Sequence, residues 1–154
     1  MSLNSQENQR IMALDVGSKT CGIAMTDPMA IICQPVTTIT YKGIGDEGRV
    51  FEALRVLFVE TEPKTIVVGQ PSKTDGSESK QAKKIQTFIV GLKKYLKSHH
   101  VKPDLFEWVY WDESFTSTEA HAFLKELSVK HAKRKKVIDK MAAVIILQNY
   151  LDSL

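Results

Sequence analysis

Two short apolar runs near the beginning of the chain constrain the fold more than any other feature. They occupy residues 11–14 and 21–25, and a turn-forming stretch lies between them. This arrangement predicts two strands joined by a tight turn. Because the first run is apolar throughout and does not alternate with polar residues, we expect it to form a central strand that is covered on both faces.

Asp15 follows the first run directly. An ionised carboxylate in a covered strand is costly unless it is paired, hydrogen-bonded or bound to a metal ion. Asp is also common in turns, because its side chain can hydrogen-bond to nearby backbone. The segment alone therefore leaves two interpretations open, a residue of the hairpin turn and a functional acid.

The rest of the chain predicts an α/β fold with one mixed five-stranded sheet flanked by helices. A third strand is expected over residues 31–39, where Pro35 favours an edge position or a bulge. Strands over 65–69 and 106–111 alternate with helices, and the expected helices cover 50–58, 82–96, 120–127 and 135–151. Hairpin connections make the first three strands antiparallel, whereas helical connections make the later strands parallel.

Length and composition fit one compact domain. The chain has 154 residues and a net charge of +3, which permits a nucleic-acid partner without requiring one. Cys21 and Cys33 lie in apolar contexts and are expected to be small buried side chains in a reducing compartment. The sequence predicts neither a membrane span nor a signal peptide, which indicates a cytoplasmic protein without a membrane partner. We expect residues 1–9 to be a disordered lead-in and residues 10–154 to form the domain.

Three further carboxylates lie where a strand ends or where the last helix begins. Asp112 and Glu113 follow the aromatic strand, and Asp139 precedes Ala142 and Ala143 by three and four residues. Two small residues on the face of Asp139 would let this helix lie close to the sheet. Each position also has an ordinary interpretation. Asp112 and Glu113 could be turn or N-cap residues at a strand end, and Asp139 could be a solvated acid that the helix dipole favours in a first turn. Helical spacing groups the following residues on one face of this helix: Val137, Met141, Val144, Gln148 and Leu151.

Convergence on a metal ion would give these carboxylates a common role. Carboxylates at one point repel one another, and a divalent cation removes this penalty. Oxygen ligands without His or Cys suit Mg²⁺ or Mn²⁺ rather than zinc. Two such ions about 4 Å apart can activate a water and stabilise the leaving oxygen during phosphodiester hydrolysis. Whether Asp112 or Glu113 would face the ion stays open, because neighbours in an extended chain point to opposite sides.

Basic residues gather before and beside Asp139 and in the turn after Asp15. A charge run is usually a solvated face. Next to an acidic metal site, however, such cations could hold the backbone phosphates of a nucleic acid. The candidates for this role are Lys19, Lys133, Arg134, Lys135 and Lys136.

Six segments resemble the YqgF/RuvX family, in the same order and over nearly the whole chain. They read LDVGSK (14–19), GIAMTDP (22–28), VVGQP (67–71), DGSE (75–78), WDESFTS (111–117) and KKVIDKMAAV (135–144). The resemblance implies an RNase H-like fold and a metal-dependent nuclease that hydrolyses phosphodiester bonds. It also implies a role in 5′-end processing of pre-16S rRNA during ribosome biogenesis, and a relationship to Holliday-junction resolvases.

The same resemblance implies roles for the acids. Asp15 is the implied metal ligand of the first strand. Glu113, with Asp112 beside it, is the implied acid at the strand end, and Asp139 is the implied acid of the closing helix. Asp15, Glu113 and Asp139 are thus the expected catalytic residues, and Mg²⁺ or Mn²⁺ is the expected cofactor.

Two residues depart from the family pattern. Thr20 and Ser114 stand where many members carry a basic residue, which removes two phosphate contacts. A non-catalytic nucleic-acid-binding protein therefore stays open beside the rRNA nuclease. A resolvase of four-way DNA junctions, which would have the same fold, is the other alternative. A nucleotide-binding phosphotransferase is a further alternative, because residues 15–18 resemble the phosphate loop of the actin and sugar-kinase group. The expected partners are structured RNA or branched DNA, in association with ribosome assembly, and the chain is expected to be a monomer or a homodimer.

Overall fold

A single mixed sheet forms the centre of the computed structural model, which describes residues 8–71, 79–112 and 130–154. In the last range, the side chains of residues 131, 132 and 134–140 are not described. The strands of the sheet are β1 (Ile11–Val16), β2 (Thr20–Thr26), β3 (Cys33–Thr40), β4 (Thr65–Gln70) and β5 (Glu107–Asp112).

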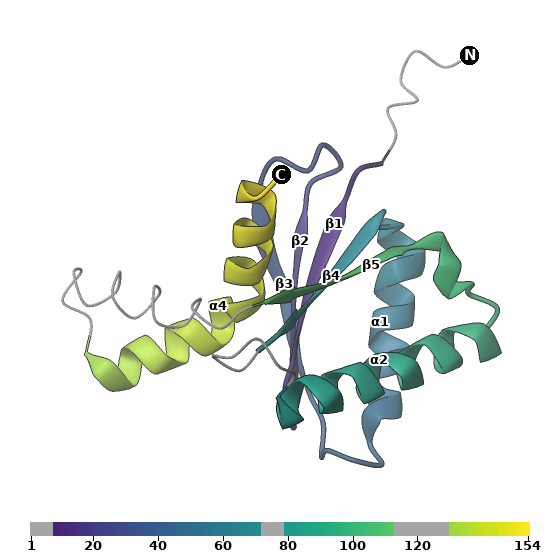
Figure 1. The fold of residues 1–154 in the computed structure, drawn as a ribbon, viewed down its shortest axis with the longest axis horizontal. Coiled ribbons are helices and arrows are strands. Elements are labelled where there is room, and N and C mark those ends of the chain that lie inside the picture. The colour runs from purple at the N-terminus through teal and green to yellow at the C-terminus, as the bar shows by residue number, and fades with distance from the viewer. Residues whose placement is uncertain (1–7, 72–78, 113–129) are drawn as a thin grey trace.

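These strands lie in the order β3-β2-β1-β4-β5 (Figure 1). The β3, β2 and β1 strands are antiparallel neighbours, whereas β1, β4 and β5 run parallel. The arrangement confirms the mixed five-stranded sheet and the RNase H-like architecture expected from the sequence. It also brings the carboxyl ends of β1, β4 and β5 to one edge of the sheet, where ligand sites of such sheets lie.

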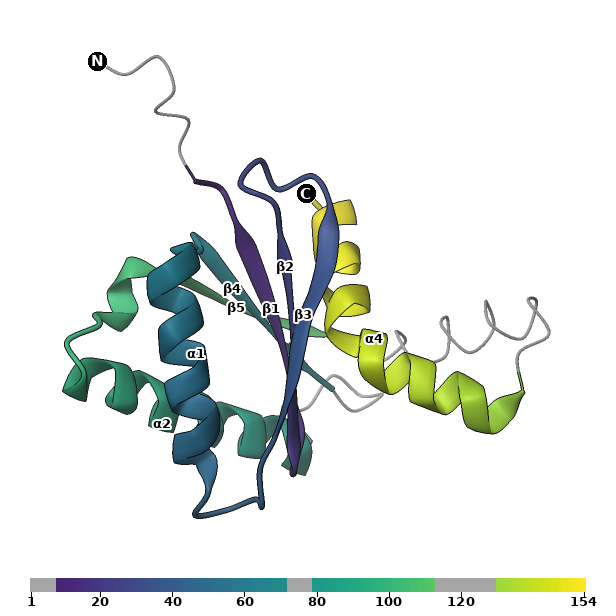
Figure 2. The same cartoon turned by 180° about the vertical axis from the view of Figure 1, so that it is seen from behind.

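Helices cover both faces of the sheet (Figures 1 and 2). The α1 helix (Glu47–Thr61) and the α2 helix (Lys80–Ser98) lie on one face, and α4 (His131–Asp152) lies on the other. A short 3-10 turn, η1 (Pro103–Leu105), leads into β5. The second half of α4 follows the sheet, whereas its first half bends away from it. The helix expected over 120–127 lies outside the described residues.

Alternate residues of β1 supply two separate hydrophobic layers. Met12 and Leu14 pack with residues of α1 and α2, whereas Ile11 and Ala13 pack with residues of α4. All four side chains are buried. This follows from the pleat, which directs successive side chains of a strand to opposite faces. The prediction that β1 is a central strand covered on both faces is therefore confirmed.

Pro35 lies in β3, at the edge of the sheet, and next to a bulge. Ile23 of β2 pairs with Thr37, and the next residue, Ala24, pairs with Pro35, so that Val36 is an extra residue in β3. Proline has no N–H to donate to a ladder, and both an edge and a bulge tolerate this loss. Both predicted environments of Pro35 are therefore present.

The chain is attached to the domain earlier than the expected boundary at residue 10. The side-chain amide of Asn8 donates to the carbonyl of Thr61 at 2.8 Å. The backbone N–H of Gln9 donates to the carbonyl of Pro28 at the same distance. Residues 1–7, the rest of the expected lead-in, lie outside the described residues. Among the residues that are described, no helix is long and apolar enough to cross a membrane.

Candidate active site at the carboxyl end of the first strand

Asp15 lies within β1 and not in the turn that follows it. The turn is closed by the N–H of Gly17, which donates to the carbonyl of Thr20 at 2.7 Å. Asp15 is half-buried, and the pleat places it on the α4 face of the sheet, together with Ile11 and Ala13. The interpretation of Asp15 as a turn residue is therefore wrong.

Gly22 of β2 is the direct neighbour of Asp15 across the sheet. A Cβ atom at Gly22 would lie 3.6 Å from the Cβ of Asp15 and 3.7 Å from the Cβ of Ala143 in α4. Ala143 itself is buried. The missing side chain of Gly22 and the small side chain of Ala143 thus let α4 approach the sheet beside Asp15. This confirms the prediction that alanine in this helix allows a close approach.

A second glycine lies on the other side of Asp15. The pairing of β1 with β4 runs to Leu14 and Val68, so the next residues along the two strands, Asp15 and Gly69, lie abreast. Asp15 is therefore flanked on both neighbouring strands by residues without side chains. Glycine inside a strand often marks a place that a ligand approaches closely. This feature was available in the sequence, but only the strand register shows that both glycines border Asp15.

Trp111 of β5 lies next to Gly69, at the border of the part of the sheet that contains Gly22, Asp15 and Gly69. It pairs with Gly69 and belongs to the same layer as α4. Its ring meets that of Tyr150 in α4 edge to face, with centroids 5.5 Å apart. The surface beside Asp15 is thus enclosed by an aromatic pair at β5 and by α4 above the sheet.

Asp112 lies on the opposite face from Asp15. It pairs with Gln70 of β4, and directly paired residues of parallel neighbours share a face. The Gln70 side chain accepts a hydrogen bond from the amide of Gln86 in α2 at 3.2 Å, which identifies this face as the α2 side. The register therefore does not bring Asp112 to Asp15, contrary to its place in the expected metal site.

The other two predicted acids are only partly placed. Glu113 lies outside the described residues, as does Ser114. Residue 139 lies in α4, four residues and about one turn before Ala143, and its side chain is not described. Within the described part of the chain, no group of three His, Cys, Asp or Glu side chains could hold a metal ion. The metal site therefore stays a prediction.

Cys21 reports the electrostatics beside Asp15. It is fully buried, as predicted, and it precedes Gly22 in β2. Burial raises the pKa of the Cys21 thiol to about 12, and the negative charge of Asp15 contributes to the rise. Cys33, the other expected buried thiol, is half-buried. The negative charge of Asp15 thus affects the pKa of a thiol that is buried on the other side of the sheet.

The predicted basic residues divide between two places. Lys19 is exposed in the turn after β1, and Lys133 is exposed in the first turn of α4. Arg134, Lys135 and Lys136 lie in α4, with side chains that are not described. The structure places Lys19 near the carboxyl end of β1, and the phosphate-binding role of all five residues stays a prediction.

Tyr41 fixes the turn that carries Lys19, a role that the sequence did not indicate. Its hydroxyl donates a hydrogen bond to the carbonyl of Gly17. Its backbone N–H donates to the carbonyl of Lys19 at 2.9 Å. Tyr41 is buried, and burial raises the pKa of its phenol. The turn between β1 and β2 is therefore held at two points by a residue beyond the end of β3.

A family model described as "RuvX: Holliday junction resolvase" matches residues 9–153 of this chain. The chain belongs to the RuvX family. A relative from Thermoanaerobacter pseudethanolicus is 40% identical over 145 residues, which cover 94% of this chain and 96% of the relative. Another, from Halalkalibacterium halodurans, is 41% identical over 143 residues, covering 93% and 96%. Both bear the name "Putative pre-16S rRNA nuclease".

Solved structures of resolvases are more distant. The RuvC protein of T. thermophilus in complex with a Holliday junction substrate matches with a TM-score of 0.46 and 9% identity, over 73% of this chain and 69% of that one. The Holliday junction resolvase of fowlpox virus matches with a TM-score of 0.47 and 15% identity, over 94% and 99%. The assignment to the RuvX family rests on the sequence and not on these matches.

Proposed function

We propose that this protein is a nuclease that hydrolyses phosphodiester bonds in precursor 16S rRNA, during 5′-end processing in the cytoplasm. The observation that carries the proposal is Asp15, half-buried at the carboxyl end of a central parallel strand and flanked by Gly22 and Gly69. Neither neighbour of this carboxylate across the sheet carries a side chain that could block the approach of a ligand. The names of the close relatives support the choice of substrate.

Mg²⁺ or Mn²⁺ fits the donors of this proposed site. The acids offer oxygen ligands, and hard divalent cations prefer oxygen. Asp15 would hold the ion together with Glu113 and Asp139. When bound, such an ion supplies a water of lowered pKa and stabilises charge on the leaving oxygen. Ala143 supports the place of α4 in this proposal, because its contact at Gly22 holds the helix beside Asp15.

Of the two acids after the aromatic strand, the proposal uses Glu113. Asp112 lies on the α2 face with Gln70, away from Asp15. Asp112 is therefore the less suitable of the two acids to share a metal ion with Asp15. The two neighbouring acids are thus expected to differ sharply in importance.

A matched pair of variants tests this proposal. Purified protein is incubated with a precursor rRNA segment that contains the 5′ end of 16S rRNA, with Mg²⁺ or Mn²⁺ and with a chelator. We expect metal-dependent cleavage, about 10²–10³-fold slower in Asp15→Asn, by analogy with the loss of one preorganised polar group that stabilises the transition state. Asp112→Asn makes the same chemical change on the other face of the sheet, and its rate should be little changed. Equal rates for wild type and Asp15→Asn would refute the role of Asp15.

A resolvase of four-way DNA junctions is the second candidate. The description of the matching family model favours it. Cleavage of a four-way DNA junction and of precursor rRNA, measured side by side at the same salt concentration, decides between the two substrates. Binding of either nucleic acid that survives the chelator, without cleavage of any substrate under any metal, would instead identify a non-catalytic binding protein. Co-sedimentation with ribosomal precursor particles tests the expected association with ribosome assembly.

A further inference from the structure

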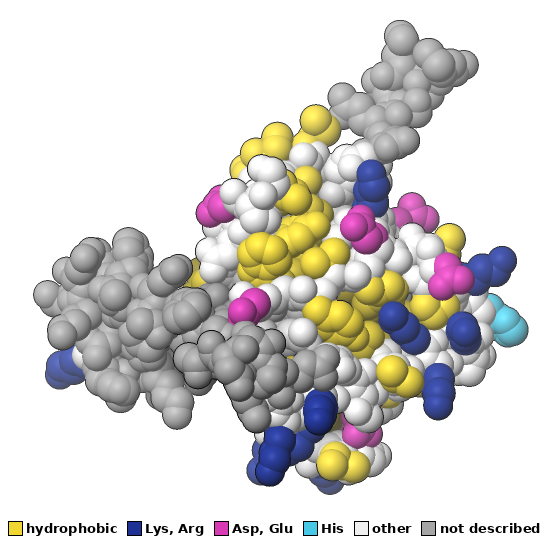
Figure 3. Space-filling model, viewed as in Figure 1, with side chains coloured by type: hydrophobic (Ala, Val, Ile, Leu, Met, Phe, Trp, Pro, Cys, Tyr) yellow, Lys and Arg dark blue, Asp and Glu magenta, His cyan; other side chains and the backbone are white. Residues whose placement is uncertain are grey.

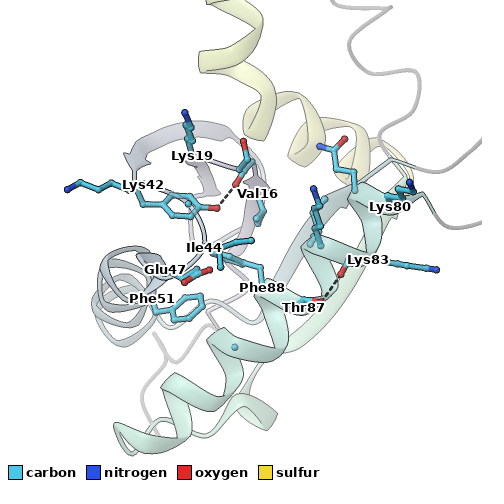
Figure 4. Close-up of a pocket in the computed structure, with 18 residues that line it drawn as sticks. Val16, Lys19, Lys42, Ile44, Glu47, Phe51, Lys80, Lys83, Thr87 and Phe88 are labelled. Atoms are coloured by element: carbon cyan, nitrogen blue, oxygen red, sulfur yellow. Dashed lines mark hydrogen bonds between the residues drawn. The ribbon is translucent and has the colours of Figure 1, made fainter.

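A groove of about 1040 Å³ lies on the face of the sheet opposite to Asp15. Its walls are the turn after β1, the segment from Tyr41 to Glu47, and the first part of α2 (Figure 4). The groove begins at Val16, the residue directly after Asp15. It is therefore separate from the candidate active site, but it reaches the same edge of the sheet.

The rim of the groove is strongly basic. Five exposed lysines line it: Lys19, Lys42, Lys80, Lys83 and Lys84. Lys19 and Lys42 lie on one side and Lys80 and Lys83 on the other, and the side chains of Lys42 and Lys83 point outward from the groove (Figure 4). The space-filling view shows Lys and Arg side chains gathered over the beginning of α2 (Figure 3). Glu47 also lines the groove, but its carboxylate accepts a hydrogen bond from the backbone of Gly45 at 2.8 Å. The positive charge on both sides of the groove thus favours an anionic ligand.

The floor of the groove is apolar and partly aromatic. The rings of Phe51 and Phe88 meet edge to face with centroids 5.0 Å apart, and the Tyr41 ring lies 6.3 Å from that of Phe88. Ile44 at the mouth of the groove is fully exposed. An inorganic anion would use the lysines alone. A ligand that uses both surfaces must combine several phosphates with flat apolar groups.

We infer that this groove binds a single-stranded segment of the RNA substrate, with phosphates on the lysines and bases against the apolar floor. Single strands offer unstacked bases to such floors, whereas a duplex presents mainly its phosphates and sugars. The strand would then cross the turn at Lys19 and reach Asp15 on the other face. This inference rests on the proposed function, because it names the path of the strand that is cut.

The turn at this crossing is held in one shape. Tyr41 contributes to the groove and hydrogen-bonds both to Gly17 and to the backbone of Lys19. Gly91 of α2 leaves room for the ring of Phe51, since a Cβ there would lie 3.2 Å from the tip of that ring. The floor and the turn are thus preorganised by contacts that exist without a ligand, which reduces the entropy lost on binding.

The test compares two pairs of lysines on one helix. Lys80→Gln/Lys84→Gln removes two groove lysines, and Lys94→Gln/Lys97→Gln removes two lysines of the same helix outside the groove. Binding of a fluorescent single-stranded RNA of about 12 nucleotides is measured by anisotropy in chelator, across a range of salt concentrations. We expect the groove pair to lower the slope of log K against log salt by roughly 1.4, as for two lost phosphate contacts on a single strand. The control pair should keep the wild-type slope.

Ile44 gives a second readout that does not involve charge. Because its side chain is fully exposed, Ile44→Ser should leave the free energy of unfolding unchanged. We expect several-fold weaker RNA binding at every salt concentration, with the wild-type slope. Loss of affinity in the lysine pair but not in Ile44→Ser would overturn the role of the apolar floor.

The outcomes separate this inference from the proposed function. Equal salt slopes for the groove pair and the control pair would overturn the inference, even if the protein cleaves precursor rRNA. Groove-dependent binding of RNA by a protein that cleaves nothing would refute the proposed function and support the inference. If ATP displaces the RNA and binds more tightly, the groove is a nucleotide site and the inference is wrong.

Discussion

Filling the space at Gly22 would test whether α4 is held against the carboxyl end of β1, without changing any acid. A Cβ at Gly22 would make ordinary contacts of 3.6 Å with Asp15 and 3.7 Å with Ala143. Alanine therefore fits. Valine adds two methyl groups about 1.5 Å beyond that Cβ. They have no space between the two neighbours, so either Asp15 or α4 must move.

The expected stabilities of the two variants have opposite signs. Gly22 does not adopt the left-handed backbone, so alanine introduces no strain there. Burial of its methyl group stabilises the folded state by about 0.8 kcal/mol. The lower conformational entropy of the unfolded chain adds a stabilisation of similar size. We expect the free energy of unfolding of Gly22→Ala to be about 1.5 kcal/mol higher than that of the wild type. Gly22→Val should lose about 1–3 kcal/mol through overpacking, and its Tm should fall by roughly 2–12 °C.

Urea and thermal unfolding of a double-mutant cycle test whether Gly22 and Ala143 are in contact. Ala143→Gly reopens the space that the larger valine side chain would need, although glycine alone costs about 1 kcal/mol in a helix. Gly22→Val/Ala143→Gly should therefore be more stable than the sum of the two single changes, by about 0.5–3 kcal/mol of coupling. Additive losses, or a Gly22→Val protein as stable as Gly22→Ala, would refute the contact between α4 and the sheet at Asp15. Cleavage of precursor rRNA should fall in Gly22→Val at temperatures where the protein is fully folded.

Two further predictions concern groups near Asp15. The folded state holds the proton of Cys21 up to a pKa of about 12, against an ordinary value of 9.0. Its contribution to stability is therefore complete below pH 9 and is lost as the pH rises towards 12, by up to about 4 kcal/mol. Urea unfolding as a function of pH should show this alkaline loss in the wild type and a smaller loss in Cys21→Ala. Tyr41→Phe removes the hydroxyl that donates to Gly17. This variant should lower the free energy of unfolding by about 0.5–1.5 kcal/mol and speed amide hydrogen exchange in the turn. Unchanged exchange would contradict the role of Tyr41.

The first strand illustrates how far the sequence determines the candidate site. An apolar run that ends in Asp15 predicts a covered strand, because burial on both faces accounts for the lack of alternation in so short a run. The same lack of alternation hides which face Asp15 occupies. That face follows from the position of α4, which is set by contacts with Ala143, more than 120 residues further along the chain.

The last helix shows the limit of periodicity. Spacing grouped Met141 and Gln148 on one face, but both are exposed, and the buried face carries Ala143, Ile146 and Leu147. Residues 141–147 are all apolar, so the sequence does not single out one face. A helix that is apolar on several sides is oriented by its neighbours. Here the space at Gly22 selects Ala143.

The choice between Asp112 and Glu113 shows what register adds. Neighbouring acids on an extended segment differ only in the face they occupy, which no local pattern records. The pairing of Asp112 with Gln70, and the hydrogen bond of Gln70 to α2, fix that face. The sequence therefore predicts that an acid lies at this edge, and the register adds that Asp112 is on the face away from Asp15. Glu113 lies outside the described residues, and its role stays a prediction.

The face of the sheet on which Thr20 lies bears on how this chain binds its substrate. It pairs with Thr40, two residues before Gly22 in β2, so the pleat assigns it to the Asp15 face. A basic residue at this position would hold phosphate beside the acids. The five groove lysines, Lys19 among them, hold positive charge on the other face. If the groove binds the strand as inferred, part of the salt dependence of RNA binding should come from a surface that lies away from the acids, in addition to any contribution of the basic residues of α4.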